Sequence, residues 1–236
     1  MVKIGVICGL LSEAKAVRSM FPDERVDIVI SGANAARAEK LATALCQGSP
    51  TSPRVDMIVS AGVSGGLLPA YQPGDLVIGS EVVTGNQERF PCDAGALARL
   101  QHSHRAAGIS PSIIFGSDRV ISSPAEKEQL RTQYDAKSVD MESHGAARAA
   151  HRAGVPFLAV RAIADPAQRA LPSAALGAVK PDGGTRIAAT LAKAAMQPTQ
   201  FPALIQLGQD SNQALKTLGV SLRGFLGVLL LSSNLG

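Results

Sequence analysis

Three carboxylic acids in this sequence stand where their types and spacing suggest chemistry: Glu13, Glu142 and Asp165. Each comes at or just after a short apolar run, where an acidic side chain is costly unless it is solvated or paired. A buried carboxyl group with a raised pKa can donate a proton, whereas an ionised one can accept hydrogen bonds or stabilise a cation. Taken singly, each is more often a helix cap or an ion-pair partner than a catalyst.

Four segments stand out, at residues 9–13, 60–66, 139–143 and 161–165, and the acids fall within three of them. Each segment ends an expected strand, and open α/β sheets bind their ligands at the carboxyl ends of strands. The second segment, SAGVSGG, is rich in glycine, which lets backbone N–H groups approach an anion or a sugar closely. It matches neither the dinucleotide fingerprint nor the Walker pattern, and a tight turn explains its glycines equally well.

Arg161 precedes Asp165 by four residues, which in a strand is two full periods. Both side chains are therefore expected on the same face, and an ion pair between them is the plainest prediction. Because Asp165 stands directly before Pro166, it could also simply open a turn.

The elements that must position these residues follow from the apolar pattern. Apolar, β-branched runs alternate with stretches of helical spacing, which favours a single three-layer α/β/α domain with a central mixed sheet. We expect strands at residues 2–8, 26–31, 55–60, 75–83, 112–115, 138–141 and 156–163, and helices at residues 12–20, 34–47, 124–134, 144–153 and 185–196.

The chain is expected to divide into a domain at residues 1–200 and a C-terminal helical apolar tail at residues 201–236. Within the tail, residues 202–218 predict a helix. Residues 222–231, LRGFLGVLLL, are too few to span a bilayer, which needs about 20 apolar residues. They either pack on the core or on a second subunit, or they meet a membrane or an apolar ligand, helped by Lys216 and Arg223.

Composition excludes several classes of protein. Apolar residues make up 46% of the chain, which is too many for disorder. Aromatic residues make up 3%, and the net charge of +4 comes without a basic run, so no nucleic-acid partner is expected. Three cysteines without a CxxC pair fit a reducing cytoplasm, and no signal-peptide pattern is seen. His102 and His104 form an HxH pair without further ligands, so no metal site is expected.

Together and in this order, the four segments resemble the nucleoside phosphorylase family, and within it the methylthioadenosine/S-adenosylhomocysteine nucleosidases. The similarity runs from about residue 4 to residue 196, through IGVICGLLSE, SAGVSGGL with PGDLVIGSEV, SVDMES and VPFLAVRAIAD. The phrases PAEKEQL, VDMESH, ADPAQRALP and PALIQLGQDSNQAL are similar to one subgroup, the hopanoid-associated phosphorylases. The resemblance implies a nucleoside phosphorylase-like fold and an enzyme that releases adenine from adenosylhopane in hopanoid side-chain biosynthesis.

The resemblance also implies roles for particular residues. Asp165 would protonate the purine N7, Glu142 would accept hydrogen bonds from the ribose hydroxyls, and Glu13 would act beside the nucleophile. Val120 stands where the nucleosidases carry a Phe near the base. The full substrate-binding set is Ser64, Gly65, Val120, Val139, Asp140, Met141 and Arg161.

The nucleophile is open between water and phosphate. Phosphate needs cationic and N–H donors, which Arg161 and the Ser64-Gly65 backbone could supply. Glu13 favours water, because a carboxylate repels phosphate and can orient or deprotonate water. The family's phosphorylases often carry an Arg in the opening loop, and none occurs between Gly5 and Ala16.

No organic cofactor is expected, and phosphate stays open as a co-substrate. The expected partners are a small or lipid-linked nucleoside and further copies of the chain, in a homodimer or a higher homo-oligomer. The expected location is cytoplasmic, with peripheral contact at the inner membrane through the tail left open. Alternative functions are a methylthioadenosine/S-adenosylhomocysteine nucleosidase, a general purine nucleoside phosphorylase, or a nucleoside-binding module without catalysis.

Overall fold

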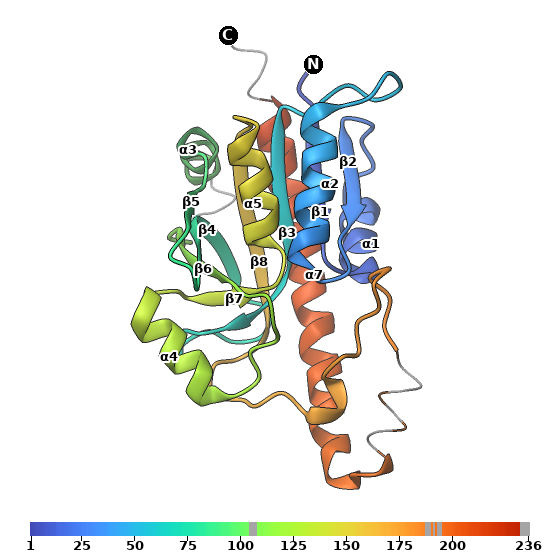
Figure 1. The fold of residues 1–236 in the computed structure, drawn as a ribbon, viewed down its shortest axis with the longest axis vertical. Coiled ribbons are helices and arrows are strands. Elements are labelled where there is room, and N and C mark those ends of the chain that lie inside the picture. Colours follow the sequence, from blue (N-terminus) through green and yellow to red (C-terminus); the bar gives the residue numbers. More distant parts are fainter. Residues whose placement is uncertain (104–107, 187–189, 191, 193–194, 232–236) are drawn as a thin grey trace.

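The computed structural model describes residues 1–103, 108–186, 190, 192 and 195–231. It has the expected α/β architecture, a central mixed sheet with helices on both faces (Figure 1). The strands are β1 (Ile4–Cys8), β2 (Val26–Ile30), β3 (Met57–Gly66), β4 (Leu76–Thr84), β5 (Arg89–Pro91), β6 (Ser112–Gly116), β7 (Ser138–Asp140) and β8 (Phe157–Asp165). The helices are α1 (Leu11–Met20), α2 (Ala35–Gln47), α3 (Ala94–His102), α4 (Pro124–Tyr134), α5 (Ser143–Arg152) and α7 (Phe201–Leu231), with short 3₁₀ helices at Ser173–Ala175 and Pro198–Gln200.

Strand β3 is the junction of the sheet. It pairs in parallel with β1 and β8, and its end pairs antiparallel with β7. Strand β8 pairs antiparallel with β4, β4 pairs in parallel with β6, and β6 pairs in parallel with β7, so these strands close into a ring with β3. Because β1, β3 and β8 run in parallel, their carboxyl ends meet at one edge, next to β7. That edge gathers the glycine-rich segment and the three segments that carry the acids.

The core lies on both sides of β8, whose residues are all buried. Helices α2 and α5 pack together on one face of the sheet, while α1 and α7 cover the other (Figure 1). Helix α5 approaches α2 closely at Gly145, where a Cβ atom would lie 2.0 Å from the Ala35 carbonyl oxygen. The domain is thus built from apolar strands covered on both sides, as expected from their lack of alternation.

The expected elements differ from the observed ones at several places. The glycine-rich segment at residues 60–66, expected to follow the strand as a ligand-binding loop or a tight turn, continues β3, because Gly65 and Gly66 pair with β7. The short edge strand β5 and helix α3, which Asp93 caps by accepting the N–H of Ala96 at 2.7 Å, were not predicted. Half of the residues in the helix expected at 185–196 lie outside the described residues, as does His104.

The apolar C-terminal segment forms one helix with the helix expected before it. The second half of α7 packs into the core, with Leu222, Phe225 and Leu226 fully buried. The helical stretch Pro198–Leu231 is long enough for a membrane span, and an 18-residue window within it has a mean hydropathy of 1.6. However, 44% of that window is buried against the domain. Residues 222–231 therefore serve core packing, one of the two expected alternatives. The first half of α7 extends past the body of the domain (Figure 1).

Candidate active site

Glu13 lies in the first turn of α1 and is held by the backbone of two segments. Its Oε2 accepts the N–H groups of Gly9 and Leu10, both at 2.8 Å, and its Oε1 accepts the N–H of Val63 at 2.8 Å. Burial raises the pKa of Glu13, and these N–H donors lower it in part. The three hydrogen bonds fix the carboxyl group against the glycine-rich end of β3.

Two glycines leave room for the acids. A Cβ atom at Gly9 would lie 2.4 Å from Oε1 of Glu142 and 3.5 Å from Oε2 of Glu13. A Cβ atom at Gly62 would lie 2.8 Å from Oε1 of Glu13. Glycine is required at both positions because any side chain would displace a carboxyl group.

Asp140 and Arg161 form a buried ion pair behind these acids. Nε of Arg161 lies 2.6 Å from Oδ2 of Asp140, and its Nη2 donates to Oγ of Ser60 at 2.7 Å. The other carboxylate oxygen, Oδ1, accepts the N–H groups of Glu142 at 3.0 Å and Ser143 at 2.9 Å, at the start of α5. Burial opposes the ionised form of Asp140, yet Arg161 and these donors hold its pKa below its ordinary value.

Glu142 is the residue that precedes α5, and its carboxyl group lies 3.8 Å from Nη2 of Arg161. Burial, together with the negative charges of Asp140 and Glu13, raises the pKa of Glu142 to about 8, although Arg161 opposes the rise. Glu142 therefore holds its proton near neutral pH when nothing is bound beside it.

Asp165 ends β8 and does not pair with Arg161, so the predicted ion pair between them is wrong. The register against β3 shifts between Ser64 and Gly65, where Ala164 is an extra residue on β8. Such a bulge interrupts the alternation of faces, which turns Asp165 away from the face of Arg161. Its partner is instead Lys127 of α4. Burial raises the pKa of Asp165, and Lys127 lowers it in part.

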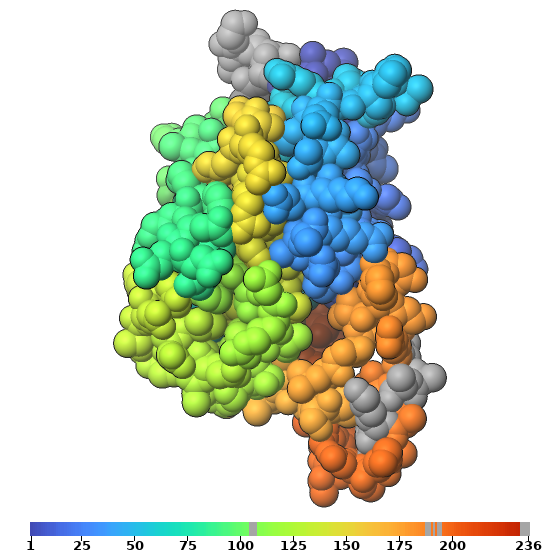
Figure 2. Space-filling model, in the orientation of Figure 1, coloured from blue at the N-terminus to red at the C-terminus, as the bar shows by residue number. Residues whose placement is uncertain are grey.

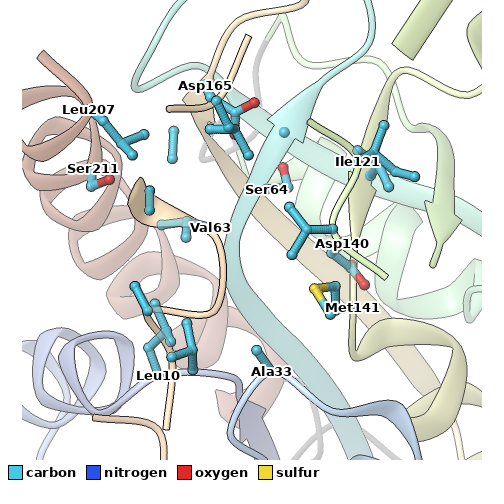
Figure 3. A pocket seen from close by; sticks show the side chains of 18 of the residues that line it. Leu10, Ala33, Val63, Ser64, Ile121, Asp140, Met141, Asp165, Leu207 and Ser211 are labelled. Carbon is cyan, nitrogen blue, oxygen red and sulfur yellow. The ribbon is translucent and has the colours of Figure 1, made fainter. Parts of the chain in front are cut away.

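A cavity of about 310 Å³ brings the predicted residues together. Figure 3 shows Asp165 and Ser64 near one end, Asp140 and Met141 further along, and Leu207 of α7 across from them. Nine of the sequence-predicted residues line this cavity: Glu13, Ser64, Gly65, Val120, Val139, Asp140, Met141, Glu142 and Asp165.

Arg161 is the predicted site residue that does not line the cavity. Its side chain is 1% exposed, and its guanidinium group is engaged by Asp140, Ser60 and the Val160 carbonyl. The expected contact between Arg161 and the substrate is therefore corrected: the arginine lies behind Asp140 and Glu142, lowers the pKa of Asp140 and partly offsets the rise in the pKa of Glu142.

The cavity continues into a larger apolar groove of about 750 Å³ beside the first half of α7. Leu10, Val63, Leu207 and Ser211 line both. In the space-filling view, the surface is hollowed between the yellow-green α4 region and the orange segment that follows β8 (Figure 2). The residues that line the groove alone include Leu11, Leu204 and Leu215.

Sequence reasoning missed the contributions of Lys127, Ser60 and α7. Lys127 looks like an ordinary surface lysine within AEKEQLR, so the sequence gives no sign of its burial. Ser60 was included in the second segment without a role. The spacing of Leu204, Leu207 and Leu215 on α7 is helical and was a readable signal for an apolar stripe.

The chain belongs to the phosphorylase superfamily, whose family model matches residues 11–197. The chain is 29% identical over 130 residues to a 5′-methylthioadenosine/S-adenosylhomocysteine nucleosidase of Anoxybacillus flavithermus. The aligned region covers 47% of this chain and 56% of the relative. The chain thus spans about half the length of the curated relatives that it matches.

Solved structures share the fold across nearly the whole chain. The Helicobacter pylori 5′-methylthioadenosine/S-adenosylhomocysteine nucleosidase with butyl-thio-DADMe-Immucillin-A aligns with a TM-score of 0.71, at 16% identity, over 96% of this chain and 98% of that one. The futalosine hydrolase of Helicobacter pylori aligns with a TM-score of 0.70, at 15% identity, over 96% and 97%.

Proposed function

We propose that this protein cleaves the N-glycosidic bond of an adenine nucleoside whose ribose carries an apolar 5′ group, with adenosylhopane as the substrate. The observation that carries the proposal is the continuity between a cavity lined by Glu13, Glu142 and Asp165 and a larger apolar groove. The first would take the nucleoside and the second its 5′ group. A role in hopanoid side-chain assembly follows from that substrate.

In the proposed reaction, Asp165 donates its proton to the purine N7. The electron pair of the bond between ribose C1′ and purine N9 moves onto the base, which leaves as neutral adenine. Burial raises the pKa of Asp165, which favours the protonated form that a general acid requires.

Glu142 would contact the ribose hydroxyls. Hydroxyl donors and the positive charge that develops on the sugar both favour an ionised carboxylate. Substrate binding would therefore draw the proton from Glu142, whose pKa is about 8 in the free site. The charge so formed would stabilise the oxocarbenium-like transition state.

Water is the proposed nucleophile. The cavity is lined by four carboxylic side chains, and among the described residues that line it Arg119 is the one cationic side chain. Arg119 is exposed and pairs with Glu126 at 2.7 Å. The backbone N–H groups of Gly9, Leu10 and Val63, which a phosphate could have used, are bound to Glu13. Glu13 would orient the water and take its proton.

The relatives suit a nucleoside with a 5′ substituent. The curated relatives are named for 5′-methylthioadenosine and S-adenosylhomocysteine, and the Helicobacter pylori structure holds a butylthio compound. A groove of about 750 Å³ is larger than a methylthio group requires, which supports a bulky apolar group in this chain. A methylthioadenosine/S-adenosylhomocysteine nucleosidase is the second candidate, favoured by those names.

The test is a comparison of substrates with and without phosphate. Purified protein is incubated with adenosylhopane, methylthioadenosine or adenosine, and adenine and the sugar product are identified by mass spectrometry. We expect the highest kcat/KM for adenosylhopane and a free ribosyl product at every phosphate concentration. A ribosyl 1-phosphate would overturn water as the nucleophile. A preference for methylthioadenosine would support the second candidate, and no release of adenine from any substrate would overturn the enzyme itself.

Two neighbouring positions on α7 test the groove. Leu204 lines it, whereas Ile205 does not line it and is 61% exposed. Leu204→Asp should raise KM for adenosylhopane by about tenfold, the cost of losing about two buried methylenes, and should spare adenosine. The matched control is Ile205→Asp, which should leave both substrates unchanged. Equal effects of the two variants would place the lipid elsewhere.

A further inference from the structure

Lys127 is a fully buried lysine that the proposed reaction leaves without a role. Its side chain is 0% exposed, and its ammonium group contacts the carboxylate of Asp165. The same Nζ donates to the carbonyl oxygens of Pro166 at 2.9 Å and Arg169 at 3.2 Å. An ammonium group has three N–H donors, and here each has an acceptor.

The local sequence explains why Lys127 points inward at this position. Ser123 precedes α4 and its Oγ accepts the N–H of Glu126 at 3.2 Å, while Pro124 occupies the first turn. This cap fixes the start of α4 beside the end of β8. Lys127, one residue after Glu126, then reaches the segment that carries Asp165.

The contacts of Lys127 involve one oxygen of Asp165 only. Nζ binds Oδ2, and within the described residues no hydrogen-bond partner is found for Oδ1. The carboxyl group lines the cavity, so Oδ1 is the oxygen free to hold a proton for a bound base. The contacts of Nζ with the carbonyl oxygens of Pro166 and Arg169 hold the backbone that follows Asp165 in place.

We propose that Lys127 is a positioning residue for Asp165, which fixes the orientation of its carboxyl group and stabilises the carboxylate formed when the proton leaves. This inference rests on the proposed function of Asp165 as the proton donor. The proton moves from Oδ1 to the purine N7, the electron pair of the glycosidic bond goes to the base, and the carboxylate remains beside Nζ. Water adds to C1′ and gives its proton to Glu13. Glu13 then releases that proton to solvent, and solvent supplies a proton to the Asp165 carboxylate.

The charged groups around Asp165 come from three elements. Lys127 faces it from α4, Arg169 from the segment after β8, and Asp210 from α7. Arg169 is itself paired with Asp210, which leaves Lys127 as the cation in direct contact with the acid. Removal of the lysine charge therefore acts on Asp165 with little compensation from the other two groups.

The experiment compares the pH dependence of adenine release in two neutral variants, Lys127→Met and Lys127→Gln, with wild type. Without the cation, the protonated form of Asp165 persists to higher pH, so the alkaline limb of kcat/KM should move up by about one pH unit or more. Plateau kcat should fall by about tenfold or more, because the acid is weaker and less well oriented. Lys127→Arg retains the charge and should keep the limb near its wild-type position.

A second readout does not depend on turnover. In protein labelled with ¹³C at the aspartate carboxyl groups, the Asp165 signal is assigned by its loss in Asp165→Asn and is titrated in wild type and variants. The pKa of Asp165 should rise in both neutral variants and stay unchanged in Lys137→Met, a partly exposed lysine paired with Asp135. Thermal unfolding checks that each variant is folded, and Lys127→Gln keeps N–H donors for the two carbonyl contacts if Lys127→Met does not fold.

The outcomes separate this inference from the proposed function. If wild type releases no adenine, the proposed function fails, while the titration still measures the effect of Lys127 on Asp165. If wild type is active and the neutral variants lose activity without a shift in the limb or in the ¹³C titration, Lys127 is merely structural and the inference is overturned.

Discussion

The guanidinium group of Arg161 lies 2.6 Å from the carboxylate of Asp140, and both side chains are 1% exposed. The pair connects β8 to the start of α5, because the second oxygen of Asp140 accepts the N–H groups of Glu142 and Ser143. Arg161 also lies 3.8 Å from the carboxyl group of Glu142. One buried cation therefore holds, through Asp140, the backbone of the proposed ribose-binding acid, and it partly offsets the rise in the pKa of Glu142.

Loss of this pair should destabilise the fold. Arg161→Met leaves the buried Asp140 carboxylate without its partner, which typically costs about 3–5 kcal/mol of unfolding free energy. Urea denaturation followed by circular dichroism measures the change. The matched control is Arg89→Met, whose partner Glu81 lies 2.6 Å away at the surface, and which should cost less than about 1 kcal/mol. Equal losses in the two variants would contradict the importance of the buried pair.

Removal of the proposed proton donor should abolish most turnover. Asp165→Asn retains the shape of the side chain but has no proton of suitable acidity, so kcat should fall by about 10²–10⁴-fold. Steady-state release of adenine measures this, and ligand binding should persist. Asp135→Asn serves as control, because Asp135 is exposed and Asn tolerates its left-handed φ of 51°. Near-normal rates in Asp165→Asn would refute the role.

The proposed contact between Glu142 and the ribose hydroxyls can be tested with paired substrates. Glu142→Gln should reduce kcat/KM for a ribonucleoside far more than for the matching 2′-deoxynucleoside, since the deoxy sugar lacks one of the groups that Glu142 would contact. Equal losses on both substrates would indicate a structural carboxyl group instead.

Stability should fall as pH rises from about 5 to about 8, and Glu142 should carry part of this trend. Its pKa of about 8 in the folded protein lies above the ordinary value of 4.5, so in this window the folded state binds a proton that the unfolded state has lost. The contribution of Glu142 to the free energy of unfolding is full below the ordinary pKa. It declines by up to about 1.4 kcal/mol per pH unit until the pH passes the pKa of the folded state.

Urea denaturation at about pH 5, 6.5 and 8 tests this linkage. Glu142→Gln cannot ionise, so its stability should depend less on pH than that of wild type. The raised pKa values of Glu13 and Asp165 act in the same direction and leave a residual slope. An identical slope in wild type and variant would contradict the raised pKa of Glu142.

The two halves of α7 should respond differently to truncation of a side chain. Leu226 is fully buried, so Leu226→Ala should cost about 2–5 kcal/mol of unfolding free energy. Ile205 is mostly exposed on the same helix, and Ile205→Ala should change stability by less than about 0.5 kcal/mol. Chemical denaturation of both variants checks the difference. A small loss in Leu226→Ala would mean that the C-terminal half does not belong to the core.

Much of the site could be predicted because strand ends are readable from sequence. The segments that carry Glu13 and Asp165 follow strands that pair in parallel with β3, which brings their ends to one edge, and β7 brings Glu142 there by antiparallel pairing with the end of β3. The partner of Asp165 could not be predicted, because one extra residue at Ala164 reverses the face that simple alternation assigns.

The burial of charged residues was the second feature that could not be predicted from the sequence. Lys127 stands in a polar helix whose other charged residues are solvated, and only the tertiary arrangement places it against β8. The two alternatives for residues 222–231 were equally compatible with their apolar composition. Packing of α7 against β8 and α1 decides between them, and composition does not encode that contact.

The burial of Leu222, Phe225 and Leu226 against β8 has a consequence for biosynthesis. A ribosome adds about 5–20 residues per second and releases the chain from its N-terminus onward. The ring of strands is complete once β8 has emerged, but the surface of β8 that α7 covers stays exposed until the second half of α7 leaves the exit tunnel. During that interval the nascent chain presents apolar surface to solvent and is prone to aggregation.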